Sequence, residues 1–65
     1  MKIYEKIEMI RIEKRISKKS IAEAFGFTAP WYSKISNGEI NIKADDIQKF
    51  AEILEVESNI FFDQR

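Results

Sequence analysis

The sequence lacks the side chains on which most catalytic and metal sites depend. Its 65 residues include no cysteine and no histidine. It therefore has no disulfide, no thiolate ligand, no reactive thiol and no imidazole to serve as a general base or zinc ligand. The serines have no evident activating base, and the carboxylates follow the spacing of a solvated helix surface. We expect a protein that is not an enzyme and that holds neither a metal ion nor a cofactor.

Long apolar runs and a targeting segment are also missing. No stretch approaches the roughly 20 apolar residues that cross a bilayer, and no signal-peptide pattern is present. We expect no membrane association and a cytoplasmic location, in a bacterial cytoplasm or nucleoid. An apolar content of 45% indicates a folded chain, and its length predicts one domain over residues 1–65. A domain this small buries only about 60% of its unfolded surface, so pairing with a second copy would stabilise it.

The net charge is zero, but the charges are unevenly distributed. Residues 1–38 contain eight Lys and Arg against four Glu, a net charge of +4, and residues 39–65 carry −4. A basic half is able to present a positive face to a polyanion such as DNA. Ordinary scatter of charge over a short chain is the alternative explanation.

The spacing of apolar residues predicts five helices and no strands. Ile3, Ile7 and Ile10 form one stripe of a first helix over residues 2–14, with Met9 and Ile12 off the stripe. The other helices are predicted over residues 18–25, 29–36, 43–54 and 58–62. Side chains expected to point inward from the second, third and fourth are Ile21, Ala22, Phe25, Tyr32, Ile35, Ala44, Ile47, Phe50, Ala51 and Leu54.

Capping residues mark several of these boundaries. Ser17 is a favourable N-cap for the second helix, and Gly26 follows where a helix exits into the left-handed region. Thr28 is the expected cap of the third helix, and Pro30 lies in its first turn, where a missing N–H does little harm. Asn37-Gly38 ends that helix; a hairpin turn is the alternative, but no strand pattern flanks it.

The second and third helices are joined by the short segment Gly26-Phe27-Thr28, which favours a steep crossing angle, as in a helix-turn-helix motif. The whole stretch, SKKSIAEAFGFTAPWYSKISNG over residues 17–38, resembles the core of Cro/cI-type, lambda-repressor-like regulators. That family's pattern is roughly Ser-Gln-x-x-Leu-Ala-x-x-Leu-Gly-Val-Ser-x-x-x-Ile-Ser-x-Ile-Glu-Asn-Gly. Residues 41–62 resemble its fourth and fifth helices, so the similarity covers nearly the whole chain.

The resemblance implies a five-helix, all-α fold that binds operator DNA as a homodimer, with the third helix in the major groove. The two third helices of a dimer would then lie about 34 Å apart, on a near-palindromic operator. Lys18 stands where the family has a Gln that commonly contacts phosphate. By position, the resemblance gives these candidate DNA-binding residues: Lys18, Lys19, Thr28, Ala29, Pro30, Trp31, Ser33, Lys34, Asn37, Asn41 and Lys43.

The chain departs from the family pattern at three places. Ser36 replaces the family's Glu, so Arg11 loses the partner that the resemblance implies and has Glu39 or a phosphate as alternatives. Lys43 replaces a capping Ser or Thr, which suggests that the cap of the fourth helix moves to Asn41.

The third departure is that the reading helix has few hydrogen-bonding groups. Ala29 and Pro30 suit thymine methyl groups, Ser33 and Lys34 are the direct polar readers, and Lys34 favours guanine. We therefore expect thymine-rich half-sites and a large share of recognition from DNA shape. Tyr32 is assigned to the core, which leaves Trp31 partly exposed on the flank, against a sugar, a thymine methyl or a phosphate.

The C-terminal segment supplies apolar bulk. One of Ile60, Phe61 and Phe62 is expected to close the core, and this group is also the predicted dimer interface. The leading functional prediction is a sequence-specific transcriptional regulator that acts as a repressor. The alternative is a protein-interaction module on the same fold, such as an antitoxin or a regulator's partner, with weak or no DNA binding.

Overall fold

Four α-helices and one short 3₁₀ helix make up the computed structural model, which describes residues 2–62, and no strand occurs in that range. The α-helices are α1 (Ile3–Glu13), α2 (Lys18–Ala24), α3 (Ala29–Ser36) and α4 (Ala44–Leu54). The last element, η1, is the 3₁₀ helix Ser58–Phe61. The predicted all-helical character is confirmed, while the predicted fifth helix is a single 3₁₀ turn.

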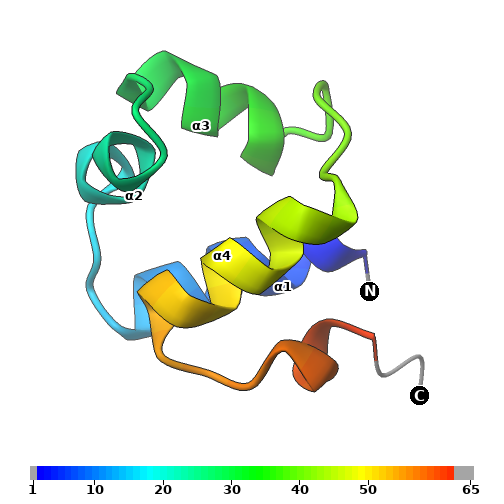
Figure 1. Ribbon diagram of the computed structural model, residues 1–65. Helices are drawn as coiled ribbons and strands as arrows, with labels where there is room; N and C mark the ends of the chain where they lie inside the picture. The colour runs from blue at the N-terminus through cyan, green and yellow to red at the C-terminus, as the bar shows by residue number, and fades with distance from the viewer. Residues whose placement is uncertain (1, 63–65) are drawn as a thin grey trace.

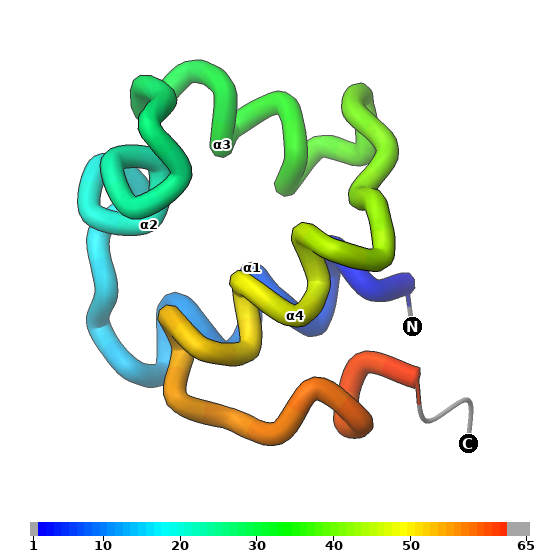
Figure 2. Tube along the Cα trace, viewed as in Figure 1, coloured from blue at the N-terminus to red at the C-terminus, as the bar shows by residue number. Residues whose placement is uncertain are grey.

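The helices enclose one core. In Figure 1, α1 and α4 run beside each other at the base, α3 lies across the top and α2 is seen nearly end-on at one end of α3. The tube in Figure 2 shows that η1 returns beneath α4 to the end where α1 begins. Lys6 Nζ donates a hydrogen bond to the Ile60 carbonyl at 2.8 Å, which ties η1 to α1.

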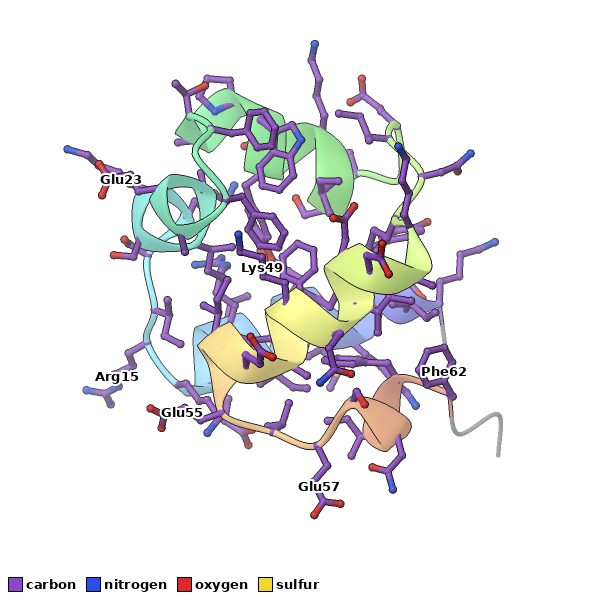
Figure 3. All side chains as sticks on the ribbon, viewed as in Figure 1. Arg15, Glu23, Lys49, Glu55, Glu57 and Phe62 are labelled. Atoms are coloured by element: carbon purple, nitrogen blue, oxygen red, sulfur yellow. The ribbon has the colours of Figure 1, made fainter. Side chains whose placement is uncertain are left out.

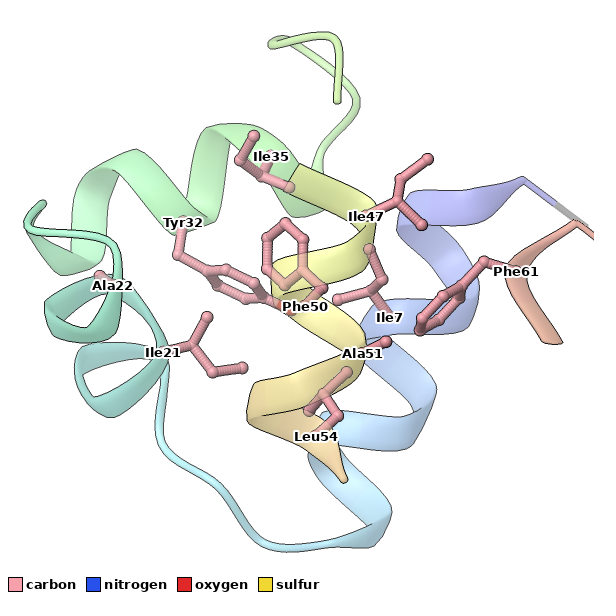
Figure 4. Packing of buried hydrophobic residues seen from close by; sticks show 10 residues of the cluster. All are labelled: Ile7, Ile21, Ala22, Tyr32, Ile35, Ile47, Phe50, Ala51, Leu54 and Phe61. Atoms are coloured by element: carbon pink, nitrogen blue, oxygen red, sulfur yellow. The ribbon is translucent and has the colours of Figure 1, made fainter. Parts of the chain in front are cut away.

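Ten side chains form the core. Tyr32 and Phe50 lie at its centre, and Figure 4 shows Phe61 from η1 next to Ile7 from α1. Among residues 2–62 no charged side chain is buried. The complete set is Ile7, Ile21, Ala22, Tyr32, Ile35, Ile47, Phe50, Ala51, Leu54 and Phe61.

Most of the predicted inward positions are confirmed. Phe25 is half-buried and packs against the core, whereas Ala44 is exposed, so its assignment to the core was wrong. Ala44 is the first residue of α4, and a side chain in a first turn need not follow the buried stripe of the helix. Met9 and Ile12 are 57% and 59% exposed, as their places off the stripe of α1 predicted.

All four α-helices end in the same way, with one residue in the left-handed region. That residue is Gly26 after α2 (φ +82°) and Gly38 after α3 (φ +79°), but Arg15 after α1 (φ +60°) and Glu55 after α4 (φ +59°). In each case the next amide donates back across the last turn, as in a Schellman motif. The bonds run from Ile16 N to Arg11 O, Phe27 N to Ala22 O, Glu39 N to Lys34 O and Val56 N to Ala51 O, at 2.9 to 3.1 Å.

The helix beginnings agree less well with prediction. The Ser17 hydroxyl oxygen accepts the Ser20 amide at 3.0 Å, which confirms the predicted N-cap of α2. Thr28 holds the N-cap position of α3, but its side chain makes no capping hydrogen bond. Lys43, not Asn41, is the N-cap residue of α4, also without a side-chain bond, so the proposed shift to Asn41 was wrong. Asp45 and Asp46 in the first turn of α4 complement its positive N-terminal dipole instead.

Candidate nucleic-acid interface

The candidate interface is built around α3, because that helix separates its inward and outward residues cleanly. At 100° per residue, Pro30, Lys34 and Asn37 fall on the side opposite Tyr32 and Ile35, with Ser33 and Ala29 nearer the boundary. Tyr32 is 0% and Ile35 2% exposed, so the inner side is fully used by the core. On the outer side Pro30 and Lys34 are exposed, while Ala29 and Ser33 are half-buried at its edge.

None of the eleven candidate residues belongs to the buried core. Three are half-buried, namely Ala29, Trp31 and Ser33. The eight exposed ones are Lys18, Lys19, Thr28, Pro30, Lys34, Asn37, Asn41 and Lys43.

The four lysines of this set carry the positive charge of the interface. Lys34 stands in the last turn of α3, and Lys18 is the first residue of α2. Lys19 Nζ lies 4.0 Å from a carboxylate oxygen of Glu23, and both side chains are more than 60% exposed. An exposed pair at that distance contributes little and gives way readily to phosphate.

Two polar side chains at the C-terminal end of α3, Asn37 and Ser36, have local partners. Asn37 Nδ2 lies 3.4 Å from Glu39 Oε2, a long hydrogen bond in the exposed loop after α3. Ser36 Oγ donates to the Ser33 carbonyl at 3.0 Å, a bond within its own helix. Within α3 itself, Ser33 and Lys34 are the polar side chains placed toward the outer face, in keeping with the Ala and Pro content of the helix.

Trp31 is half-buried on the flank of α3, as expected, and it is surrounded by rings. Its ring centroid lies 4.7 Å from that of Phe27, 5.0 Å from Phe25 and 6.5 Å from Phe50. Figure 3 shows Lys49 on the side of α4 that faces α2 and α3, and its ammonium lies 5.0 Å from the Phe25 ring centre. The indole therefore packs among these rings beside the outer face rather than on it.

Phe27 and Glu8 are two residues that the sequence analysis did not single out. Phe27 resembles the family's apolar turn residue in type, yet it is 52% exposed and stacks on Trp31. Glu8 accepts a bidentate ion pair from Arg11, with Nε–Oε1 at 2.9 Å and Nη2–Oε2 at 2.8 Å. The three-residue spacing of Glu8 and Arg11 on one helix was the available signal.

Arg11 thus pairs with Glu8 rather than with Glu39, so the predicted pairing with Glu39 was wrong. Its Nη1 also donates to the Ile16 carbonyl at 2.8 Å. The hydrogen bonds from Arg11, with a smaller part from the Tyr32 hydroxyl, lower the pKa of Glu8 to about 2 against the penalty of burial. Glu8 in turn raises the pKa of Arg11.

The C-terminal prediction is confirmed in one respect and corrected in another. Phe61 is 1% exposed, so one of the three apolar residues does close the core. Its inclusion in a dimer surface was wrong for the same reason, since its side chain is not accessible. Ile60 is 36% and Phe62 54% exposed, and Figure 3 shows Phe62 at the edge of the molecule, beside η1.

A family model described as helix-turn-helix matches residues 7–61. The chain belongs to the Cro/cI-type helix-turn-helix family. This match supports DNA binding as the kind of activity, since the family consists of DNA-binding regulators. Neither a curated protein nor a solved structure matches the chain. Across residues 2–62 no helix is long and apolar enough to span a bilayer.

Proposed function

We propose that this helix-turn-helix protein is a sequence-specific repressor that binds double-stranded DNA as a dimer. In this proposal α2 and α3 form the helix-turn-helix unit, and α3 lies in the major groove. The observation that carries it is the division of α3 into an inner side, where Tyr32 and Ile35 are buried, and an outer side, where Pro30 and Lys34 are exposed, within a chain of a DNA-binding family.

The outer side of α3 is proposed to read bases mainly by shape and apolar contact. Ala29 and Pro30 would lie against thymine methyl groups, while Ser33 and Lys34 would offer polar contacts to base edges. The backbone contacts are assigned to exposed residues of α2, the turn and the loop after α3. They are Lys18, Lys19, Thr28, Asn37, Asn41 and Lys43.

A second copy of the chain is the proposed partner, and Ile60 and Phe62 are the proposed dimer contacts. Both are exposed apolar side chains on the same short segment, and a two-fold arrangement would make this one surface self-complementary. Such a dimer would bind half-sites one duplex turn, about 34 Å, apart.

Selection of duplexes from a random pool, carried out at two salt concentrations, tests the function. We expect a near-palindromic site with thymine-rich half-sites, and an affinity that falls linearly in log salt with a slope of about −0.9 per phosphate contacted. Lys34→Ala should weaken binding and relax the base preference at one position of each half-site. Unchanged affinity and preference in that variant would remove Lys34 from the reading surface.

A protein-interaction module is the second candidate, and one observation favours it. Phe27, Met9 and Ile12 are each more than half exposed, so they offer apolar surface to a protein partner. Recovery of no duplex at low salt would reject the regulator proposal and favour this candidate.

A further inference from the structure

Tyr32 of the reading helix α3 brings one polar group, its hydroxyl, into the core. Tyr32 is 0% exposed, and its hydroxyl donates to Glu8 Oε1 at 2.7 Å. A hydroxyl without a partner in an apolar core would be strongly destabilising. Within residues 2–62 no buried side-chain polar atom lacks a hydrogen-bond partner, so this requirement is met.

Glu8 is itself held firmly in place. The Arg11 guanidinium donates to both carboxylate oxygens of Glu8, through Nε and Nη2. Its Nη1 donates to the Ile16 carbonyl, in the segment that leads to α2. The guanidinium carbon also lies 5.7 Å from the centre of the Tyr32 ring. The network therefore joins α1, the α1–α2 segment and α3 through one carboxylate.

The ionisation states of Tyr32 and Glu8 determine which group donates the hydrogen bond and which accepts it. Burial, followed by the hydrogen bond to Glu8, raises the pKa of Tyr32 above its ordinary value. At neutral pH Tyr32 is thus a donor, and Glu8 is a charged group that only accepts. A charge-assisted hydrogen bond of this kind is short and directional, unlike the apolar contacts around it.

Directionality matters because α3 has only eight residues and carries the reading residues on the same short helix as Tyr32, so a rotation at Tyr32 moves them all. Packing of Tyr32 and Ile35 against the core resists separation of the helix, but apolar contacts set its rotation only loosely. The helix contains no acidic residue of its own, and the Ser36 hydroxyl is used within the helix. Any carboxylate that anchors α3 has to come from another element.

We propose that Glu8 is a positioning residue of the DNA-reading surface, which fixes the rotation of α3 about its axis by accepting the Tyr32 hydroxyl while Arg11 holds the carboxylate. This inference rests on the proposed DNA-reading function. Glu8 touches no base in this scheme, and its effect reaches DNA through the placement of Ala29, Ser33 and Lys34.

The test compares affinity for the selected duplex with affinity for a random duplex of equal length, at one salt concentration. Tyr32→Phe keeps the ring and removes the hydroxyl, and Glu8→Gln keeps the size and one acceptor but loses the paired charge. We expect each variant to lower the ratio of specific to non-specific affinity by about tenfold. Non-specific affinity should stay within about twofold, since exposed lysines tolerate a rotated helix.

The ratio separates positioning from a loss of folded protein. Partial unfolding weakens both affinities in the same proportion and leaves their ratio unchanged. Tyr4→Phe is the matched control, because Tyr4 is half-buried, lies against Gly38 and takes no part in the Glu8 network. It should leave the ratio unchanged. Tyr32→Phe leaves no buried hydroxyl unpaired, so it decides the question even if Glu8→Gln folds poorly.

Two failures are distinguishable. A wild-type chain that binds selected and random duplexes equally would overturn the proposed function, and this inference with it. A wild-type chain that discriminates, while both folded variants keep the ratio within twofold of it, would overturn the role of Glu8 alone.

Discussion

The two flanks of α3 are held by different kinds of contact. On the side of α1, Tyr32 meets a charged network through a hydrogen bond of 2.7 Å to Glu8. On the side of α2 and α4, Trp31 meets the rings of Phe25 and Phe50 at centroid distances of 5.0 and 6.5 Å. The first flank is held by one directional hydrogen bond to a charged group, and the second by buried apolar area and by contacts between aromatic rings.

The difference suggests a division of labour between the flanks. Apolar and ring contacts contribute most of the free energy of folding but tolerate small rotations and exchanges of shape. A hydrogen bond to a fixed charge adds less free energy and specifies one arrangement. The aromatic flank is therefore expected to govern stability, and the polar flank to govern where the reading residues point.

The largest expected effect comes from the aromatic flank. Phe50 is 0% exposed and lies between Tyr32 and Phe25, so Phe50→Ala leaves a cavity at the centre of the core. We expect a loss of about 4 kcal/mol in the free energy of unfolding, enough to unfold much of a small domain. Urea unfolding followed by circular dichroism measures it. Ile12→Ala, on the exposed side of α1, is the control and should cost less than about 1 kcal/mol. Equal losses would contradict the central place of Phe50.

The contribution of the polar flank to stability should depend on pH. The pKa of Glu8 is lowered to about 2 from an ordinary value of 4.5, chiefly by its hydrogen bonds with Arg11. Between pH 4.5 and 2, Glu8 is therefore protonated in the unfolded chain but still ionised in the folded chain. The charge on Glu8 therefore adds its full contribution to the free energy of unfolding above pH 4.5. This contribution, about 2 kcal/mol after screening by solvent, is lost as the pH falls towards 2.

Glu8→Gln isolates that contribution. The variant should be less stable than the wild type at pH 7, and the gap should close between pH 4.5 and 2 because the wild type alone loses this term. Thermal unfolding at several pH values provides the measurement. Parallel curves for the two proteins over the whole window would show that the Glu8 charge adds nothing to folding.

The two glycines that border α3 sharpen the comparison further. Gly26 on the aromatic side and Gly38 on the α1 side both have φ near +80°. A Cβ at Gly26 would meet nothing within 4 Å, whereas one at Gly38 would lie 2.9 Å from Tyr4 Cζ. Gly26→Ala should cost about 1 kcal/mol from backbone strain alone, and Gly38→Ala about 2 kcal/mol. Denaturant midpoints measured side by side test this, and equal costs would show that Tyr4 moves aside freely.

The sequence was sufficient to predict the elements whose signals are local. Periodic apolar residues located α1 to α4, and Ser17 and the two glycines marked real boundaries. The same periodicity placed Tyr32 inside and Lys34 outside, which determines most of the candidate face. Arg15 and Glu55 also lie in the left-handed region. Nothing in the sequence distinguishes them from other charged residues, so it gave no sign of these two helix ends.

The polar network could not be predicted in full, because it joins residues far apart in the chain. The spacing of Glu8 and Arg11 is a local signal, but 24 positions separate Glu8 from Tyr32. The family pattern drew attention to Ser36 as the site of a missing acid. Only the folded arrangement shows that α1 supplies the carboxylate instead.

Phe27→Ala should have only a small effect on stability, and it tests whether the aromatic flank also borders DNA. Phe27 is 52% exposed and stacks on Trp31 at 4.7 Å, so we expect a loss of only about 1 kcal/mol. Trp31 is the sole tryptophan, and its emission should shift to longer wavelength as water replaces the Phe27 ring. If this flank lies along the backbone of bound DNA, the selected duplex should also change Trp31 emission in the wild type. An emission spectrum that the duplex leaves unchanged, at concentrations where binding is complete, would confine Trp31 and Phe27 to a structural role.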